Sequence, residues 1–281
     1  MRRRRGDEAA SVAAPTGAHP APARGAAPSV RCLAVIPARL GSTRLPRKAL
    51  LRESGTFLFQ HVAERAARAR LLDAVIVATD AVEIAEAASS AGIECRMTSP
   101  RHPSGTDRVF EVALAYPEAS IVVNVQGDEP EIEPEDLDAL VTTLEGSGAD
   151  VATLATPFRE GEDPADSNAA KVVLARDGRA LYFSRAAVPF RRDGGIYLRH
   201  IGVYAFRRPA LEAFAASPPS PLEQVEGLEQ LRLLEIGGEG FRIQVRLTDS
   251  SPRGIDTRAD YDRFLAKLRA TGGKAWRSTS S

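Results

Sequence analysis

The stretch that most constrains this chain is Leu33–Leu50, where a short apolar run passes directly into a loop of small and cationic residues. Leu33–Ile36 is branched, apolar and long enough for a buried strand. Pro37 ends that strand, because proline has no N–H to donate to a ladder. The following loop contains a glycine, two hydroxyl residues and four cations: Gly41, Ser42, Thr43, Arg39, Arg44, Arg47 and Lys48. Exposed backbone N–H groups beside cations form a cradle for phosphates, so the sequence predicts a phosphate-binding loop here rather than a solvated basic loop.

Predicted strands and helices alternate along the first half of the chain. We expect strands at Ala74–Ala78, Glu94–Thr98 and Ile121–Val125, and helices at Phe57–Arg70, Val82–Ala91, Thr106–Ala115 and Pro134–Leu144. Such alternation is typical of βαβ units. It predicts an α/β fold with a doubly wound, mostly parallel sheet.

The second half is richer in strands. We expect strands at Val151–Ala155, Ala170–Ala175, Leu181–Ser184, Leu198–Phe206 and Phe241–Leu247, with a hairpin turn at Asp177-Gly178. Leu222–Glu235 has leucine-type residues every three positions and predicts one helix, ended by Gly237-Gly238. Thr257–Ala270 predicts the last helix. The hairpin-rich part, at about residues 168–207, is an insertion into the parallel sheet.

Composition excludes several classes of protein. The 281 residues hold 37 Lys and Arg against 37 Asp and Glu, so the net charge argues against a general nucleic-acid or membrane-surface binder. No apolar run is long enough for a membrane helix. The two cysteines, Cys32 and Cys95, are expected to be buried thiols in a reducing cytoplasm.

The first 31 residues differ in character from the rest of the chain. They are rich in Ala, Pro and Arg and contain almost no bulky apolar side chains. Such a segment cannot bury enough surface to offset its ordering entropy. We expect a disordered extension at residues 1–31, with a start placed too early or a transit peptide as alternatives, and a single domain at residues 32–281.

A second informative stretch, Asn124–Pro130, follows the predicted strand Ile121–Val125. Its polar residues therefore lie at the carboxyl end of a strand, where open α/β sheets bind ligands. Gly127 allows a close turn, and Asp128 offers a hard oxygen ligand suited to Mg²⁺. The alternative is an ordinary turn at the end of a strand.

Two strings together point to a family. Pro37-Ala38-Arg39 followed by Ser42–Pro46 and Lys48, and the string VNVQGDEP at Val123–Pro130, resemble the signature of the CMP-sugar synthetases, which are cytidylyltransferases. The resemblance covers about Leu33–Ala270 and is strongest to members that act on 3-deoxy-D-manno-octulosonate (Kdo). It implies a nucleotide-diphospho-sugar transferase-like fold. It also implies transfer of CMP from CTP to Kdo for lipopolysaccharide biosynthesis, with Mg²⁺ as cofactor, in a cytoplasmic homodimer formed through the insertion.

The resemblance also assigns the nucleotide and metal sites. It implies nucleotide binding by residues of the first loop and of two later loops: Pro37, Ala38, Arg39, Ser42, Thr43, Lys48, Arg101, Ser104 and Gln126. It gives catalytic roles to Arg39, Lys48, Asp128 and Asp256, and places Mg²⁺ on Asp128 and Asp256. Taken alone, Asp256 would be only the N-cap of the helix that follows. Arg47 stands where the family signature often has glycine.

For the acid sugar, the resemblance implies Arg185, His200, Tyr204, Glu226 and Gln230. Glu226 and Gln230 are four residues apart, so we expect them on one face of the predicted helix Leu222–Glu235. Arg185 is the expected bidentate partner of the sugar carboxylate. His200 is either a proton-handling group or a packed structural histidine.

Other functions stay open at this point. Sialic acid or 8-amino-Kdo could replace Kdo as the acceptor. A glycosyltransferase of similar fold would carry an Asp-x-Asp motif after a strand, and Gln126-Gly127-Asp128-Glu129 does not match it. A non-catalytic nucleotide-binding protein would need no second carboxylate and no acceptor pocket.

Overall fold

The computed structural model describes residues 30–236 and 240–271, so the expectations for residues 1–29 and for Gly237-Gly238 lie outside the described residues. The strands are β1 Cys32–Pro37, β2 Ala74–Thr79, β3 Cys95–Met97, β4 Ile121–Val125, β5 Val151–Pro157, β6 Lys171–Leu174, β7 Ala180–Ser184, β8 Leu198–Arg207 and β9 Ile243–Leu247. The helices are η1 Lys48–Leu50, a short 3₁₀ turn, and α1 Leu58–Ala66, α2 Val82–Ser90, α3 Gly105–Ala113, α4 Pro134–Ser147, α5 Arg208–Ala216, α6 Pro221–Glu226, α7 Gln230–Glu235 and α8 Arg258–Ala270.

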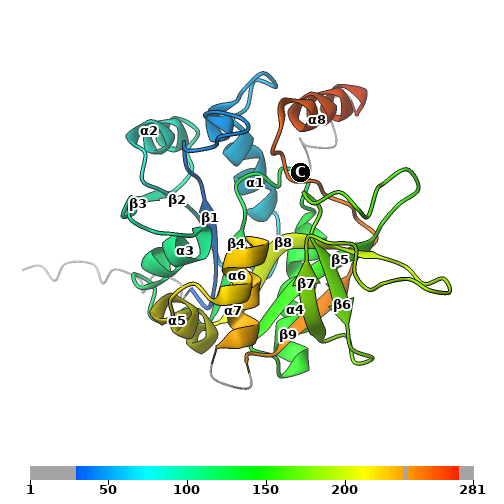
Figure 1. The fold of residues 1–281 in the computed structure, drawn as a ribbon. Helices are drawn as coiled ribbons and strands as arrows, with labels where there is room; N and C mark the ends of the chain where they lie inside the picture. Colours follow the sequence, from blue (N-terminus) through cyan, green and yellow to red (C-terminus); the bar gives the residue numbers. More distant parts are fainter. Residues whose placement is uncertain (1–29, 237–239, 272–281) are drawn as a thin grey trace, which may run out of the picture.

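The central sheet has the order β3-β2-β1-β4-β8-β5-β9 and is mostly parallel (Figure 1). Strand β8 runs antiparallel to both of its neighbours, β4 and β5, whereas β9 is parallel to β5. The hairpin β6–β7 lies outside this strand order. It joins β8 through one register pair, Lys171 with Arg199. The predicted α/β fold with a mostly parallel sheet is therefore confirmed, as is the turn at Asp177-Gly178, where the N–H of Gly178 donates to the carbonyl of Ala175.

Helices cover both faces of the sheet because side chains alternate along each strand. On β1, Cys32, Ala34 and Ile36 face one core together with α1, α2 and α4. Leu33 and Val35 face the other core, which includes α3, α5, α7 and the β6–β7 hairpin. Both faces of the parallel strands are apolar, as burial between two helical layers requires.

The predicted helix Leu222–Glu235 is wrong as a single helix. Helix α6 ends at Gly227, which has a left-handed backbone with φ 62°, and α7 begins at Gln230. A left-handed residue reverses the chain direction at a helix end, and glycine adopts it without steric cost. Glu226 and Gln230 therefore lie on different helices and do not share a face.

Helix α5, Arg208–Ala216, was not predicted from the sequence. Its signals are Pro209 in the first turn and the buried residues Ala210, Leu211 and Phe214. The strand pattern of β8 runs directly into it, because β8 ends at Arg207 and α5 starts at the next residue. Because no loop separates the two elements, the change of apolar spacing from strand to helix is not visible in the sequence.

The last helix packs beside the first loop. Leu45 of the loop after β1 forms a small apolar core with Leu58, Ile255, Tyr261, Phe264 and Leu265. Figure 1 shows α8 at the end of the molecule where the loop after β1 emerges. This core fixes the segment just before α8 against the predicted phosphate loop. Across residues 30–236 and 240–271, no helix is long and apolar enough to span a membrane.

The carboxyl ends of β1 and β4 form the switch point of the sheet. The two strands are parallel neighbours, and the chain leaves β1 toward β2 on one side and β4 toward the opposite edge. A crevice at such a point is where open α/β sheets bind ligands. Here the two loops approach so closely that a Cβ atom at Gly127 would lie 2.8 Å from the carbonyl oxygen of Pro37.

Gly127→Ala is therefore expected to push the two loops apart. Forcing an extra carbon into a packed contact with backbone should lower the free energy of unfolding by about 1–3 kcal/mol. Gly41→Ala is the matched control, because a Cβ there has no neighbour within 4 Å and its backbone is not left-handed. Urea unfolding of both variants measures the difference, and equal stabilities would contradict the close approach.

Candidate active site

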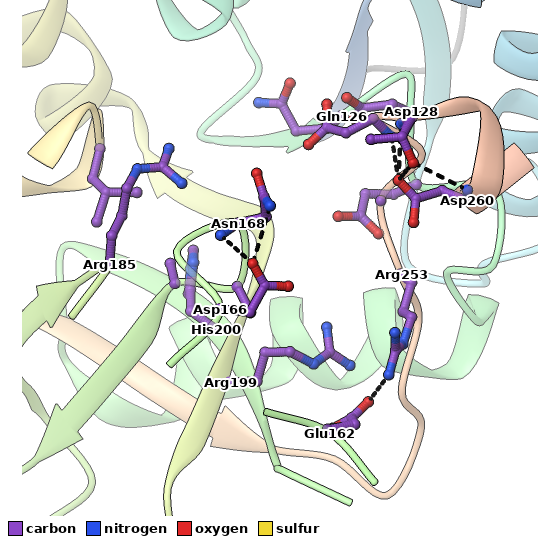
Figure 2. Close-up of a pocket in the computed structure, with 18 of the residues that line it drawn as sticks. Gln126, Asp128, Glu162, Asp166, Asn168, Arg185, Arg199, His200, Arg253 and Asp260 are labelled. Atoms are coloured by element: carbon purple, nitrogen blue, oxygen red, sulfur yellow. Dashed lines mark hydrogen bonds and ion pairs between the residues drawn. The ribbon is translucent and has the colours of Figure 1, made fainter. Parts of the chain in front are cut away.

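A cavity of about 650 Å³ opens at this switch point. Its lining draws on the loop after β1 (Arg44), the end of β4 (Gln126, Asp128, Glu129), the β5–β6 loop (Asn168), β8 (Arg199, His200, Tyr204), the α6–α7 junction (Glu229, Gln230) and the segment before α8 (Asp256). Figure 2 shows Gln126 and Asp128 at one end of the cavity, with Arg185, His200 and Arg199 across from them.

A carboxylate pair lies at the end of the cavity that the loop after β1 and the end of β4 form. Asp128 comes from the end of β4 and Asp256 from the segment before α8. The ammonium of Lys48 joins them, with its Nζ 2.5 Å from Asp128 Oδ2 and 3.0 Å from Asp256 Oδ1. The same Nζ donates to the carbonyl of Ile255 at 3.0 Å. The N–H of Ile255 donates to the carbonyl of Asp128 at 2.8 Å, so backbone and side-chain contacts hold the two acids together.

The electrostatics of this centre keep Lys48 charged. Burial lowers the pKa of Lys48, but the two carboxylates outweigh burial, and the net shift raises its pKa.

Asp256 is not the N-cap of α8. That position belongs to Thr257, whose side chain accepts a hydrogen bond from the N–H of Asp260. The carboxylate of Asp256 is thus available to cations.

The structure places the four loop cations differently. Arg44 lines the cavity, donating to Asn168 Oδ1 at 2.7 Å and pairing with Asp256 Oδ2 at 2.9 Å. Arg47 pairs with Glu83 of α2 and has a left-handed backbone with φ 58°, the conformation for which glycine is preferred. Arg39 is exposed and lies outside the lining that the described residues form, so its predicted role stays a prediction. The sequence named Arg44 only as one of the four cations of the predicted phosphate-binding loop, and the family resemblance gave it no individual role.

The amino end of α3 meets the switch point. A Cβ at Gly105 would contact Pro37 at 3.5 Å and Gln126 at 3.6 Å, so the predicted nucleotide residues Pro37, Ser104 and Gln126 come together here. Ser104 is the N-cap of α3, accepting from the N–H of Asp107. Arg101 is exposed and lies outside the lining drawn from the described residues.

Glu229 was missed by the sequence reasoning. Its carboxylate accepts from the N–H groups of Gly105 and Thr106, each at 3.3 Å, and from the hydroxyl of Thr106 at 2.6 Å. A carboxylate at a helix N-terminus satisfies free N–H groups and the helix dipole. Glu229 therefore joins the α6–α7 junction to the amino end of α3, beside the switch point. The break between α6 and α7 at Gly227 brings Glu229 to this position. The regular leucine spacing gives no sign of that break.

The predicted sugar residues divide into two groups. Arg185, His200, Tyr204 and Gln230 line the cavity, and the hydroxyl of Tyr204 donates to Gln230 Oε1 at 3.0 Å. Glu226 does not lie in the cavity lining formed by the described residues. Its carboxylate instead accepts from the hydroxyl of Ser184 at 2.7 Å and the N–H of Arg185 at 2.8 Å, so it fastens α6 to β7.

His200 is a neutral, packed side chain. Burial lowers its pKa to about 3, with a smaller contribution from Arg199. Its Nε2 lies 2.9 Å from the hydroxyl of Thr153. This environment favours the structural histidine over the proton-handling one.

Three buried polar atoms of the cavity lining lack a hydrogen-bond partner within the described part of the chain. They are Glu129 Oε2, Arg199 Nε and Gln230 Nε2. Buried polar groups are nearly always paired in folded proteins, so each of these atoms calls for a further partner, such as an ordered water. Burial, then Asp128, raises the pKa of Glu129 to about 8.

The donor set of the carboxylate pair is compatible with Mg²⁺. Asp128 and Asp256 already converge on one cationic centre, the Lys48 ammonium, so the arrangement accommodates positive charge. Residues 30–236 and 240–271 contain no cluster of three or more metal-ligating His, Cys, Asp or Glu side chains. Mg²⁺ needs only one or two carboxylates when phosphate oxygens supply further ligands.

Comparison with known proteins identifies the family. Residues 33–246 match the family model described as Cytidylyltransferase. The chain belongs to the cytidylyltransferase family. The 3-deoxy-manno-octulosonate cytidylyltransferase of Nitratidesulfovibrio vulgaris (strain Hildenborough) is 46% identical to it over 252 residues, which cover 86% of this chain and 98% of that protein. The 3-deoxy-manno-octulosonate cytidylyltransferase of Anaeromyxobacter sp. (strain Fw109-5) is 49% identical over 244 residues, covering 85% of this chain and 98% of that protein.

A solved structure agrees with these relatives. The structure of CMP:2-keto-3-deoxy-manno-octonic acid synthetase complexed with CTP superposes on this cytidylyltransferase with a TM-score of 0.79 and 38% identity, over 86% of this chain and 99% of that chain. The family expected from the sequence is confirmed. Asp256 lies beyond residue 246, where the family model ends, and the structure brings it to the site.

The pKa of His200 predicts a pH dependence of stability. Between about pH 6.5 and 3 the unfolded chain binds a proton that the folded protein excludes, so the free energy of unfolding falls as pH falls. His200→Gln should reduce this slope by up to about 1.4 kcal/mol per pH unit, the value for one proton. Urea unfolding between pH 4.5 and 6.5 measures it.

His61→Gln provides the comparison in the same titration. Burial lowers the pKa of His61 only to about 4, so between pH 4.5 and 6.5 its variant should remove a similar slope, and the two variants should differ only below about pH 4. A slope that stays unchanged in His200→Gln would show that His200 titrates normally in the folded protein.

Proposed function

We propose that this cytidylyltransferase transfers CMP from CTP to Kdo and releases pyrophosphate. The observation that carries the proposal is the juxtaposition of two chemistries in one cavity. A carboxylate pair with Lys48 and Arg44 lies at one end, and the polar side chains of Arg185, Tyr204 and Gln230 line the rest. The first suits a triphosphate, and the second suits a polyol acid. The names of the relatives support the same pair of substrates.

The reaction is a nucleotidyl transfer. The anomeric hydroxyl of the sugar acid attacks the α-phosphorus of CTP. A new P–O bond forms, the bond to the β-phosphate oxygen breaks, and pyrophosphate leaves. Positioning and charge neutralisation dominate catalysis in such phosphoryl chemistry. In this chain Arg44, Lys48 and Arg39 are the cations of the loop that supply that neutralisation.

Mg²⁺ is proposed as the cofactor, held by Asp128 and Asp256. When bound, Mg²⁺ polarises phosphate oxygens and draws charge from the leaving group. Lys48 contacts the same two carboxylates, so the ammonium and a metal ion compete for them. The phosphate oxygens of CTP would then accept hydrogen bonds from the ammonium, which is the role we propose for Lys48 in nucleotide binding.

Arg185 is the proposed partner of the acceptor carboxylate. Its Nε donates to the carbonyl of Glu226 at 2.7 Å, and its terminal nitrogens donate to the carbonyls of Ser167 at 2.8 Å and Gly227 at 3.1 Å. The guanidinium carries more N–H groups than these acceptors use, so each terminal nitrogen keeps one for a ligand. Paired N–H groups match a carboxylate in bidentate geometry.

A homodimer formed by the insertion is also proposed. The segment between β7 and β8 exposes Phe190 to 90% and Ile196 to 64%. Exposed apolar side chains on a projecting segment are typical of an interaction surface.

A cytoplasmic location is proposed as well. Cys32 and Cys95, both described by the structure, are free thiols, which suits a reducing compartment.

The test of the function is pyrophosphate release by the full chain with Mg²⁺ and CTP. Release is expected with Kdo and not with sialic acid, and not when UTP or ATP replaces CTP. Lys48→Met should lower kcat/KM at least about 100-fold, because it removes a preorganised charge at the phosphates. Lys267→Met, an exposed lysine of α8, is the matched control and should leave turnover unchanged.

Each alternative has its own outcome in this assay. Release with 8-amino-Kdo or sialic acid but not with Kdo would keep the chemistry and change the acceptor. CTP binding without release in the presence of any acceptor would leave a nucleotide-binding protein and contradict the proposal. Near wild-type turnover of Lys48→Met would refute the role of the ammonium.

A further inference from the structure

Lys171 is a buried lysine that the chemistry described above does not use. Its side chain is fully buried. Its ammonium donates to three main-chain carbonyls, at 3.0 Å to Asp166, 2.7 Å to Ala169 and 2.5 Å to Arg185. A lysine is rarely this deeply buried unless its charge is fully paired. Three carbonyl dipoles use all three donors of the ammonium.

The position of Lys171 in the sheet shows which segments these contacts hold together. Lys171 begins β6 and pairs with Ser184 of β7 and with Arg199 of β8. The pair with Arg199 joins the hairpin to the central sheet. Beside it, the N–H of His200 donates to the carbonyl of Ala170 at 2.9 Å. Lys171 therefore lies at the joint between the insertion and the strand that carries His200 and Tyr204.

The three carbonyls belong to the wall of the cavity opposite the carboxylate pair. Asp166, Asn168 and Ala169 line the cavity from the β5–β6 loop, and Arg185 lines it from the end of β7. Figure 2 shows Asp166, Asn168 and Arg185 facing the open space across from Asp128. The ammonium thus ties two chain segments of this wall to one buried point.

A second contact closes the arrangement. The guanidinium of Arg185 donates to the carbonyl of Ser167 at 2.8 Å, in the same loop that Lys171 holds. Lys171 fixes the main chain of Arg185, and the Arg185 side chain fixes the loop. If the ammonium were lost, both ends of this ring of contacts would be released together.

We propose that Lys171 is a positioning residue for the acceptor sugar acid. It sets the direction of the Arg185 guanidinium and the position of the wall at Asp166–Ala170, without touching the substrate. This inference rests on the proposed function, because it takes the cavity beside Arg185 as the acceptor site. It assigns no part in nucleotide binding to Lys171, since all of its contacts lie on the acceptor side.

Lys171→Met tests the inference, because methionine keeps the length of the side chain and removes the charge. The KM for Kdo should rise at least about tenfold, whereas the KM for CTP should change less than about twofold. CTP binding measured by calorimetry should also stay unchanged. Lys267→Met, an exposed lysine, is the matched control and should alter neither KM.

Hydrogen–deuterium exchange supplies a readout that needs no substrate. In Lys171→Met, exchange should become faster at residues 163–170 and 185–188 and stay unchanged in α2 and α3. Lys171→Arg is the second variant, in case the methionine variant does not fold. A planar guanidinium cannot direct its donors at three converging carbonyls as an ammonium does, so the same selective changes are expected.

Two results would overturn the inference. The first is an equal rise of both KM values or an equal rise of exchange throughout the chain, which would indicate a merely structural lysine. The second is an unchanged KM for Kdo together with unchanged exchange at residues 163–170. A wild-type chain that releases no pyrophosphate with Kdo would instead refute the proposed function, and the exchange experiment would still decide whether Lys171 holds the wall.

Discussion

The site depends on one electrostatic contact, the ammonium of Lys48 between the carboxylates of Asp128 and Asp256. These three side chains come from three distant segments: the loop after β1, the end of β4 and the segment before α8. Two packing constraints bring the segments together. Gly127 lets the β4 loop approach Pro37, and Leu45 packs with Ile255 and α8. The two carboxylates repel each other, so packing places them side by side and the ammonium between them offsets their repulsion.

The cavity then joins two halves of different origin. The half at the carboxylate pair, which we propose binds the nucleotide, belongs to the parallel sheet and its switch point. The other half, which we propose binds the acceptor, belongs to the antiparallel strand β8, the β6–β7 hairpin and the α6–α7 junction. Glu229 links the halves, because it lies in the α6–α7 junction and satisfies the amino end of α3.

The sequence predicted the strands well because each is an apolar run ended by proline, glycine or polar residues, as at Leu33–Pro37 and Ile121–Val125. It predicted Asp128 and Lys48 because a family signature surrounds them. It failed at Leu222–Glu235, where a leucine spacing of three continues across Gly227 although the backbone turns left-handed there. The roles of Arg44, Glu229 and Lys171 depend on contacts between segments far apart in the chain. No local pattern reports such contacts, and the misplacement of Glu226 has the same cause.

We expect Asp128 and Asp256 to act as one centre, although the family model covers only the first. A double-mutant cycle of Asp128→Asn and Asp256→Asn, measured as kcat/KM for CMP transfer, tests this most directly. Groups that act as a unit lose function together, so the double variant should be no more than about threefold worse than the poorer single variant. Losses that multiply, or near wild-type turnover of Asp256→Asn, would contradict a shared centre.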